Sequence, residues 1–140
     1  MRDFSAIHEG FKNYLKADAT LMTLAPGGIW LKEAPQAARG VFVIWRVQAT
    51  EQDLTHDRGG YDKVVYSVMA ATQDSNPAGA LAAARRMNEL LTGARFPVDG
   101  YQVVRCELWP DGPDINEVDL DGDRRWQYRG AVWDVWVSPQ

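Results

Sequence analysis

The chain has 140 residues, of which 46% are hydrophobic and 24% are charged, and its formal net charge is −4. This composition is typical of a globular protein, and the length fits a single domain over residues 1–140. A net negative chain has no general attraction to phosphate, which disfavours nucleic acid as a specific partner. The single cysteine excludes a disulfide within the chain and a thiolate metal cluster.

The sequence shows no leader and no membrane span. No positively charged segment precedes an apolar stretch at the N-terminus, and no apolar run approaches the ~20 residues that cross a bilayer. We therefore expect a chain that is made in the cytoplasm and has no membrane partner.

The N-terminal region has helical spacing. Asp3 suits the N-cap, and the residues that follow predict an amphipathic helix to about Asp18, because apolar side chains recur at steps of three and four: Phe4, Ile7, Phe11, Tyr14 and Leu15. A short turn over residues 20–24 ends at the Pro-Gly-Gly run 26–28.

Strand signals come next. Residues 29–33 form a short candidate strand, and the run 40–48 is dense in β-branched and aromatic residues. That run begins apolar on both faces, as in a strand covered on two sides. A polar stretch with a turn at residues 57–60 separates it from a second long run, 61–72. Together they predict a long antiparallel hairpin whose tip extends beyond the core.

The clearest helix prediction covers residues 77–91. Asn76 suits the N-cap, Pro77 the first helical position and Gly93 the C-terminal cap. A single apolar stripe runs along this helix: Ala80, Ala83, Ala84, Met87, Leu90 and Leu91. Its small alanines allow the helix to lie close to a sheet.

Strand candidates at 101–109 and 125–137 complete the chain, joined by a polar connection over 110–123. The elements together predict an α+β fold, in which a mostly antiparallel β-sheet with a long β-hairpin is packed by an N-terminal helix and one central helix on one face.

The sequence carries no catalytic signature. The nucleophile-elbow, Walker, dinucleotide-binding and zinc-protease motifs are all missing. Cys106 lies in an apolar-rich run and is interpreted as a small buried hydrophobe, with nothing in the sequence placing a histidine beside it. Residues 119–123 do not fit a calcium loop, because glycine arrives at the fourth position instead of the sixth. We expect no catalytic site, no cofactor and no metal.

The connection 111–123 contains six carboxylates and neither lysine nor arginine. Such charges repel one another, so the segment is either solvated or faces a basic partner. On a neighbouring subunit the candidate counter-charges are Arg85, Arg86, Arg124, Arg125 and Arg129.

The strand candidates at 40–48 and 125–137 contain four tryptophans: Trp45, Trp126, Trp133 and Trp136. The last two are an odd number of residues apart, so they point to opposite faces of the final strand. One of them therefore lies away from the main core, either buried against another subunit or exposed on the surface. A tryptophan platform for sugar binding is a weaker third interpretation.

The order of elements resembles the tail-completion family of long-tailed phages, which includes tail terminators and head-to-tail joining proteins. The resemblance spans nearly the whole chain. It comprises a helix leading to Gly28, Ile29 and Trp30, then Pro35 before the run 41–45, the hairpin strand 61–72, the alanine-rich helix 77–91 and the closing run 129–136. The acidic connection 111–123 is longer than expected of the family.

This resemblance implies a virion structural protein located in the tail or neck of a phage-like particle and assembled in the host cytoplasm. It implies a homo-oligomeric, hexameric ring at the head-proximal end of the tail, whose partners are the tail tube protein and the head connector or stopper protein. Tube polymerisation stops at this ring, and DNA passes through its lumen without specific binding. No catalytic residues carry over.

For such a ring we expect subunit contacts at the hairpin tip, the acidic connection and the last strand: Asp57, Arg58, Asp111, Asp114, Glu117, Asp119, Asp121, Asp123, Arg125, Trp133 and Trp136. The alternatives are another neck, stopper or baseplate component, and a small ligand-binding module that uses exposed tryptophans. A small hydrolase is a third alternative and requires two carboxylates with perturbed pKa values in one pocket.

Overall fold

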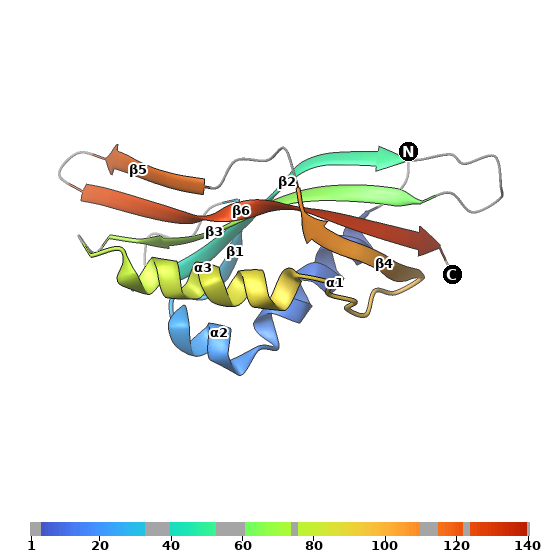
Figure 1. Cartoon of the computed structure of the whole chain (residues 1–140), viewed down its shortest axis with the longest axis horizontal. Helices are drawn as coiled ribbons and strands as arrows, with labels where there is room; N and C mark the ends of the chain where they lie inside the picture. Colours follow the sequence, from blue (N-terminus) through green and yellow to red (C-terminus); the bar gives the residue numbers. More distant parts are fainter. Residues whose placement is uncertain are drawn as a thin grey trace.

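The computed structural model describes residues 4–32, 40–52, 61–73, 76–109, 115–121 and 124–139. Within these ranges the elements are α1 (Ser5–Lys16), α2 (Ala19–Leu24), β1 (Ile29–Leu31), β2 (Phe42–Gln52), β3 (Asp62–Thr72), α3 (Ala78–Leu91), β4 (Tyr101–Leu108), β5 (Ile115–Asp121) and β6 (Arg124–Pro139). The helices lie on one side of a mostly antiparallel sheet (Figure 1), which confirms the predicted α+β fold.

Five of the strands follow one another across the sheet in the order β1-β2-β3-β6-β4, with β1 parallel to β2 and the other neighbours antiparallel. Strands β2 and β3 form the predicted long hairpin, in register from Phe42↔Ala71 to Gln52↔Asp62. A bulge between Val47 and Ala49 interrupts this ladder.

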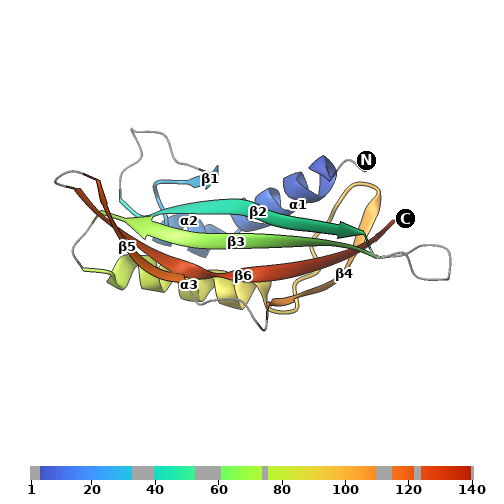
Figure 2. The ribbon, with the colours of Figure 1, turned by 90° about the horizontal axis from the view of Figure 1, so that it is seen from above.

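The acidic connection differs from the prediction, because its residues 115–121 form strand β5. This strand pairs with β6 from Ile115↔Gly130 to Asp121↔Arg124, while β4 pairs with the other end of β6. Pairing with β6 supplies a hydrogen-bonded ladder that overrides the low strand propensity of aspartate and asparagine. The β5–β6 arm and the β2–β3 hairpin extend toward opposite ends of the molecule (Figure 2).

The main core lies between the sheet and the helices. Helix α1 buries Ile7, Phe11 and Leu15, as its spacing predicted. The ring of Phe11 stacks on that of Tyr66 in β3, with centroids 4.1 Å apart and an interplanar angle of 6°. Because Tyr66 also meets Trp45 of β2 at 5.8 Å, one aromatic cluster joins α1 to the two central strands.

Helix α3 buries the predicted alanine-rich stripe except for Leu90, which is partly buried, and the helix begins one residue later than expected. Pro77 occupies the N-cap position, and the Asn76 side chain accepts a hydrogen bond from the Ala78 N–H at 3.0 Å. Asn76 therefore caps the chain through an Asx-type turn just before the helix. At the other end, Gly93 has a φ of 67°, in the left-handed region that the predicted cap requires.

The short turn predicted at residues 20–24 is helix α2. Asp18 is its N-cap and accepts a hydrogen bond from the Leu21 N–H at 2.8 Å. The same carboxylate receives two hydrogen bonds from Arg86 of α3, at 2.9 and 2.8 Å, so a bidentate ion pair fixes α2 against α3.

No helix within the described ranges is long and apolar enough to cross a membrane.

Candidate interaction surface

The helix-free face of the sheet carries a second, smaller apolar cluster. Phe42, Ile44, Met69 and Ala71 are buried there, and Trp126 packs against the cluster with its ring edge-on to Phe42, at a centroid distance of 5.5 Å. The start of β2 is thus apolar on both faces, as the sequence predicted. This is the face turned toward the viewer in Figure 2.

A groove of about 590 Å³ opens on the same face. Val65, Met69 and Val132 supply apolar walls, whereas Arg46 and Lys63 supply positive charge. A surface that combines apolar side chains with cationic ones is suited to binding an acidic or mixed protein segment.

Trp109 also lines this groove, at the junction where β4 ends and β5 begins along β6. Its backbone N–H donates to the Val132 carbonyl at 2.9 Å, while more than a third of the residue remains exposed. Arg46, Lys63 and Trp109 were not among the residues predicted from the sequence. The alternation along 61–72, which places Lys63, Val65 and Ser67 on one face, was a signal for Lys63 alone.

Trp133 and Trp136 lie on opposite faces of β6, as their odd spacing predicted. Trp133 is 2% exposed and belongs to the main core, whereas Trp136 is only partly buried. The Lys63 ammonium lies 5.1 Å from the centroid of the Trp136 ring, a cation–π contact beside the groove. Of the two predicted interface tryptophans, the main core takes up Trp133, and Trp136 remains on the surface.

The remaining predicted interface residues are divided. Asp57, Arg58, Asp111, Asp114 and Asp123 lie outside the described residues. The backbones of Glu117, Asp119 and Asp121 lie on β5, and that of Arg125 lies on β6 opposite Leu120. These four positions are therefore brought together in one arm, at the end of β6 away from Trp136.

The candidate counter-charges are divided as well. Arg86 is engaged within its own chain by Asp18 and by Glu89, the latter at 2.9 Å. Arg85 of α3 and Arg129 of β6 instead line a common cavity.

Two side chains of the types that act as nucleophile or base, Cys106 and His8, have defined surroundings in the fold. Burial, reinforced by the negative charges of Asp134 and Glu107, raises the pKa of the Cys106 thiol to about 12, so it is protonated at neutral pH. His8 Nδ1 shares a 2.7 Å hydrogen bond with the Tyr66 hydroxyl, whose pKa is raised by burial. Cys106 therefore behaves as the buried hydrophobe that the sequence predicted.

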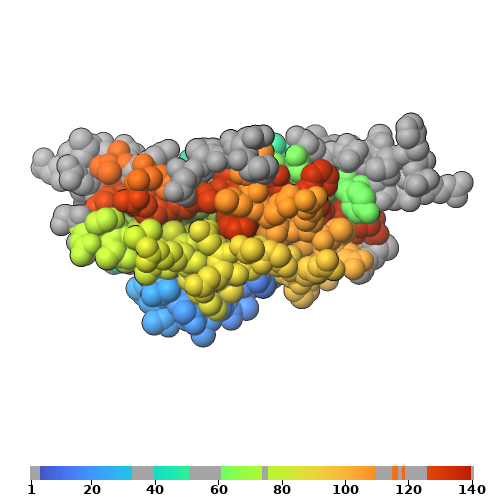
Figure 3. Space-filling model, in the orientation of Figure 1, coloured from blue at the N-terminus to red at the C-terminus, as the bar shows by residue number. Residues whose placement is uncertain are grey.

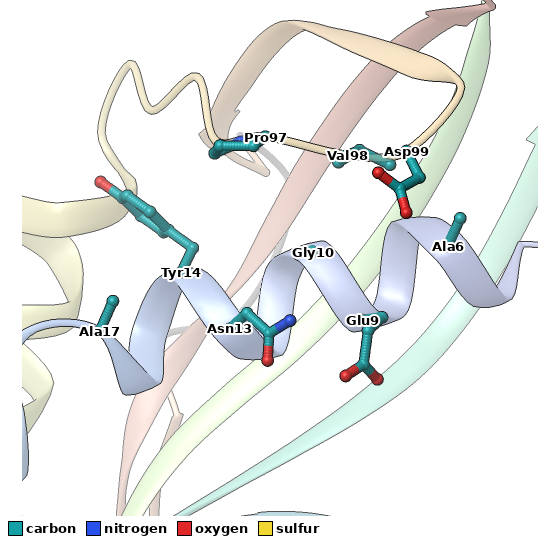
Figure 4. A pocket seen from close by; sticks show the side chains of 9 residues that line it. All are labelled: Ala6, Glu9, Gly10, Asn13, Tyr14, Ala17, Pro97, Val98 and Asp99. Carbon is teal, nitrogen blue, oxygen red and sulfur yellow. The ribbon is translucent and has the colours of Figure 1, made fainter.

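A second cavity, of about 450 Å³, lies between α1 and residues 97–99 and is lined by the carboxylates Glu9 and Asp99 (Figure 4). The Glu9 side chain points away from Asp99 in this view, and Lys12 binds it at 3.0 Å and lowers its pKa. A general acid needs a raised pKa, so the lowered pKa of Glu9 does not suit this carboxyl to that role.

No family model matches the sequence, and no curated protein matches it either. Among solved structures, the fold is similar to a chain described as "Virion of native gene transfer agent (GTA) particle", with a TM-score of 0.70, 19% identity and coverage of 96% of both chains. A second solved structure has a TM-score of 0.58 and 12% identity, and the match covers 100% of this chain and 97% of the other. At such identities the likeness shows a shared fold over the whole chain.

Proposed function

We propose that this chain is a virion structural protein of a phage-like particle, and within it a tail-completion subunit. In this role it forms a hexameric ring at the head-proximal end of the tail tube, stops tube polymerisation and joins the tail to the head connector. The observation that carries the proposal is the full-length likeness in fold to a chain of a gene transfer agent virion.

The distribution of surfaces supports a ring subunit. A ring closes through a head-to-tail contact, in which two different surfaces of each subunit meet. The groove with Arg46, Lys63 and Trp109 lies outside the main core, and two hairpin arms extend toward opposite ends of the molecule. One subunit thus offers separate surfaces to two neighbours.

The net charge also suits a channel for DNA. A chain of net charge −4 repels phosphate, so DNA passes through the lumen without adhering to it. We propose that the hairpin tip near Asp57 and Arg58, or the acidic arm with Glu117, faces this lumen or an adjacent subunit. A structure of the assembled ring in which both point into bulk solvent would contradict this arrangement.

The test is deletion of the gene in its parent system, followed by negative-stain imaging of the lysate, with a plasmid-borne copy as the control. Overlong tails identify a terminator, and finished tails detached from DNA-filled heads identify a joining protein. Normal particles would overturn the proposal. A ligand-binding module would then become the leading function, tested by glycan titration of tryptophan fluorescence.

A further inference from the structure

Two arginines from distant parts of the chain share one small cavity. This cavity, of about 230 Å³, lies between α3 and the β5–β6 arm and is lined by Arg85, Asn88, Ile115 and Arg129 among others. In Figure 3 the start of α3 (yellow-green) lies against coloured atoms of β6 (red) at the left of the view.

The fold explains why Arg85 and Arg129 line the same cavity. Arg85 directly follows Ala84 of the buried stripe and is exposed at its edge. Arg129 pairs in register with Ala70, a residue of the main core, and is two residues from the core residue Ala131, so it lies on the helix-covered face of β6. The α3 residue and the β6 residue therefore approach the same cavity from its two sides.

These two arginines differ from Arg86 and Arg105 in how they are neutralised. Arg86 is bound by Asp18 and Glu89, and Arg105 by Glu107 at 2.9 Å. Within the described part of the chain, neither Arg85 nor Arg129 makes an ion pair or a side-chain hydrogen bond. Two like charges beside one cavity repel each other, and each guanidinium has donors in a fork that matches a carboxylate.

The chain itself carries the complementary group. Strand β5 has acidic residues at alternate positions, namely Glu117, Asp119 and Asp121, within a segment that has neither lysine nor arginine. In the same chain the register partner of Arg129 on β5 is the uncharged Asn116. Among the described strands β5 pairs only with β6, so no described strand occupies its other edge.

We propose that the cavity bearing Arg85 and Arg129 is the docking point for the acidic β5 of a second copy of this chain. The contact rests on the proposed function and deepens it, because it names one head-to-tail contact between neighbouring subunits of the ring. A carboxylate of the incoming strand accepts hydrogen bonds from both guanidinium groups.

The test is a charge swap divided between two variants. The first, Arg85→Glu with Arg129→Glu, has an acidic cavity and the native acidic arm. The second, Glu117→Lys with Asp119→Lys and Asp121→Lys, has a basic arm and the native basic cavity. Each variant alone presents like charges across the contact, whereas a mixture lets every arm meet a cavity of opposite sign. The matched control for the first variant, Lys16→Glu with Arg95→Glu, makes the same change in net charge on exposed residues elsewhere.

Association is measured by sedimentation velocity up to about 1 mM, the range in which weak contacts become populated. We expect each variant alone to associate at least ~10-fold more weakly than the wild type, the mixture to recover, and the control to match the wild type. Recovery in the mixture also shows that both variants are folded.

The same variants are then expressed in the deletion strain, where finished particles are counted. The inference is overturned if either variant alone associates, or completes tails, as well as the wild type does. It is also overturned if the mixture recovers neither association in solution nor finished particles in the deletion strain. Recovery of association in solution, together with normal particles after gene deletion, supports the contact and overturns the tail-completion role. If the mixture recovers association but forms only a closed dimer, the result supports the contact between copies and contradicts the ring.

Discussion

The two faces of the sheet are both apolar, yet they are organised differently. On the helix-covered face, Phe11 and Tyr66 stack at 4.1 Å within one continuous core. On the helix-free face, the smaller cluster around Phe42 gives way to a groove with Arg46 and Lys63 beside it. The difference indicates that the first face supplies most of the stability of the fold, whereas the second is suited to contact with other subunits.

The sharpest test of this comparison is Trp133→Ala against Trp136→Ala, two truncations of the same side chain on opposite faces of β6. Trp133 is 2% exposed, so its removal leaves a cavity and costs about 3–5 kcal/mol of unfolding free energy. Trp136 is partly buried and loses mainly its contact with Lys63, worth about 1 kcal/mol. Urea denaturation measures both, and equal losses would remove the distinction between the faces.

The boundary between the sheet body and the β5–β6 arm is tested by Gly130→Ala. A Cβ built on Gly130 would clash with the carbonyl oxygen of Val68, so β6 and β3 must separate to admit it. We expect a loss of about 1–3 kcal/mol, as for other overpacked positions. The control is Gly79→Ala in the first turn of α3, where the nearest atom is a Val41 methyl group at 3.0 Å. Equal stability of the two variants would contradict the close approach of the strands.

The sequence predicted those features that depend on local spacing. Helix α3, the β2–β3 hairpin and the split between Trp133 and Trp136 follow from periods of 3.6 and 2 and from turn residues. Strand β5 was missed, because its acidic residues have low strand propensity and its ladder comes from β6.

The candidate sites were less predictable than the fold. The groove joins Lys63 of β3 to Trp109 beyond β4, and the basic cavity joins Arg85 to Arg129. Both depend on the register of β6 with its neighbours, which no local pattern in the sequence determines. The sequence identified Arg85 and Arg129 as candidates and left open which of five arginines would come together.

The ion pair between Asp18 and Arg86, on the helix-covered side of the sheet, allows a test in which the pH is varied. The hydrogen bonds from Arg86 lower the pKa of Asp18, so this carboxylate stabilises the fold above the unfolded pKa of about 4. That contribution is lost as the pH falls through the lowered folded value. Asp18→Asn keeps an N-cap for α2 but loses the charge, and we expect it to cost about 1 kcal/mol at pH 7.

As the pH falls from 7 through the lowered folded pKa of Asp18, the difference between the wild type and Asp18→Asn should shrink, because the wild-type carboxylate takes up a proton. Urea denaturation at a series of decreasing pH values checks this prediction. A difference that stays constant across the series would show that the side-chain charge is not its cause. Asp18→Ala, which also removes the cap, should be less stable than Asp18→Asn throughout the series.

Thiol labelling at two adjacent positions of β4 compares the two faces of the sheet directly. The substitution that it needs has the smallest expected effect on stability. Cys106 lies on the core side with 2% exposure and a pKa raised to about 12, so at pH 8 only about one thiol in 10⁴ is ionised. The next residue, Glu107, points to the other face and is paired with Arg105 at 2.9 Å. Glu107→Cys removes only this exposed ion pair, which contributes little.

In native Glu107→Cys we expect one thiol to react at once with an aromatic disulfide reagent and the second to react only after urea is added. The wild type should show the slow phase alone, since only the thiolate attacks the reagent. Fast labelling of the native wild-type chain would mean that the core side of β4 opens on the timescale of the experiment. In that case the helix-covered face would not be the rigid one, and the division of roles between the two faces would fail.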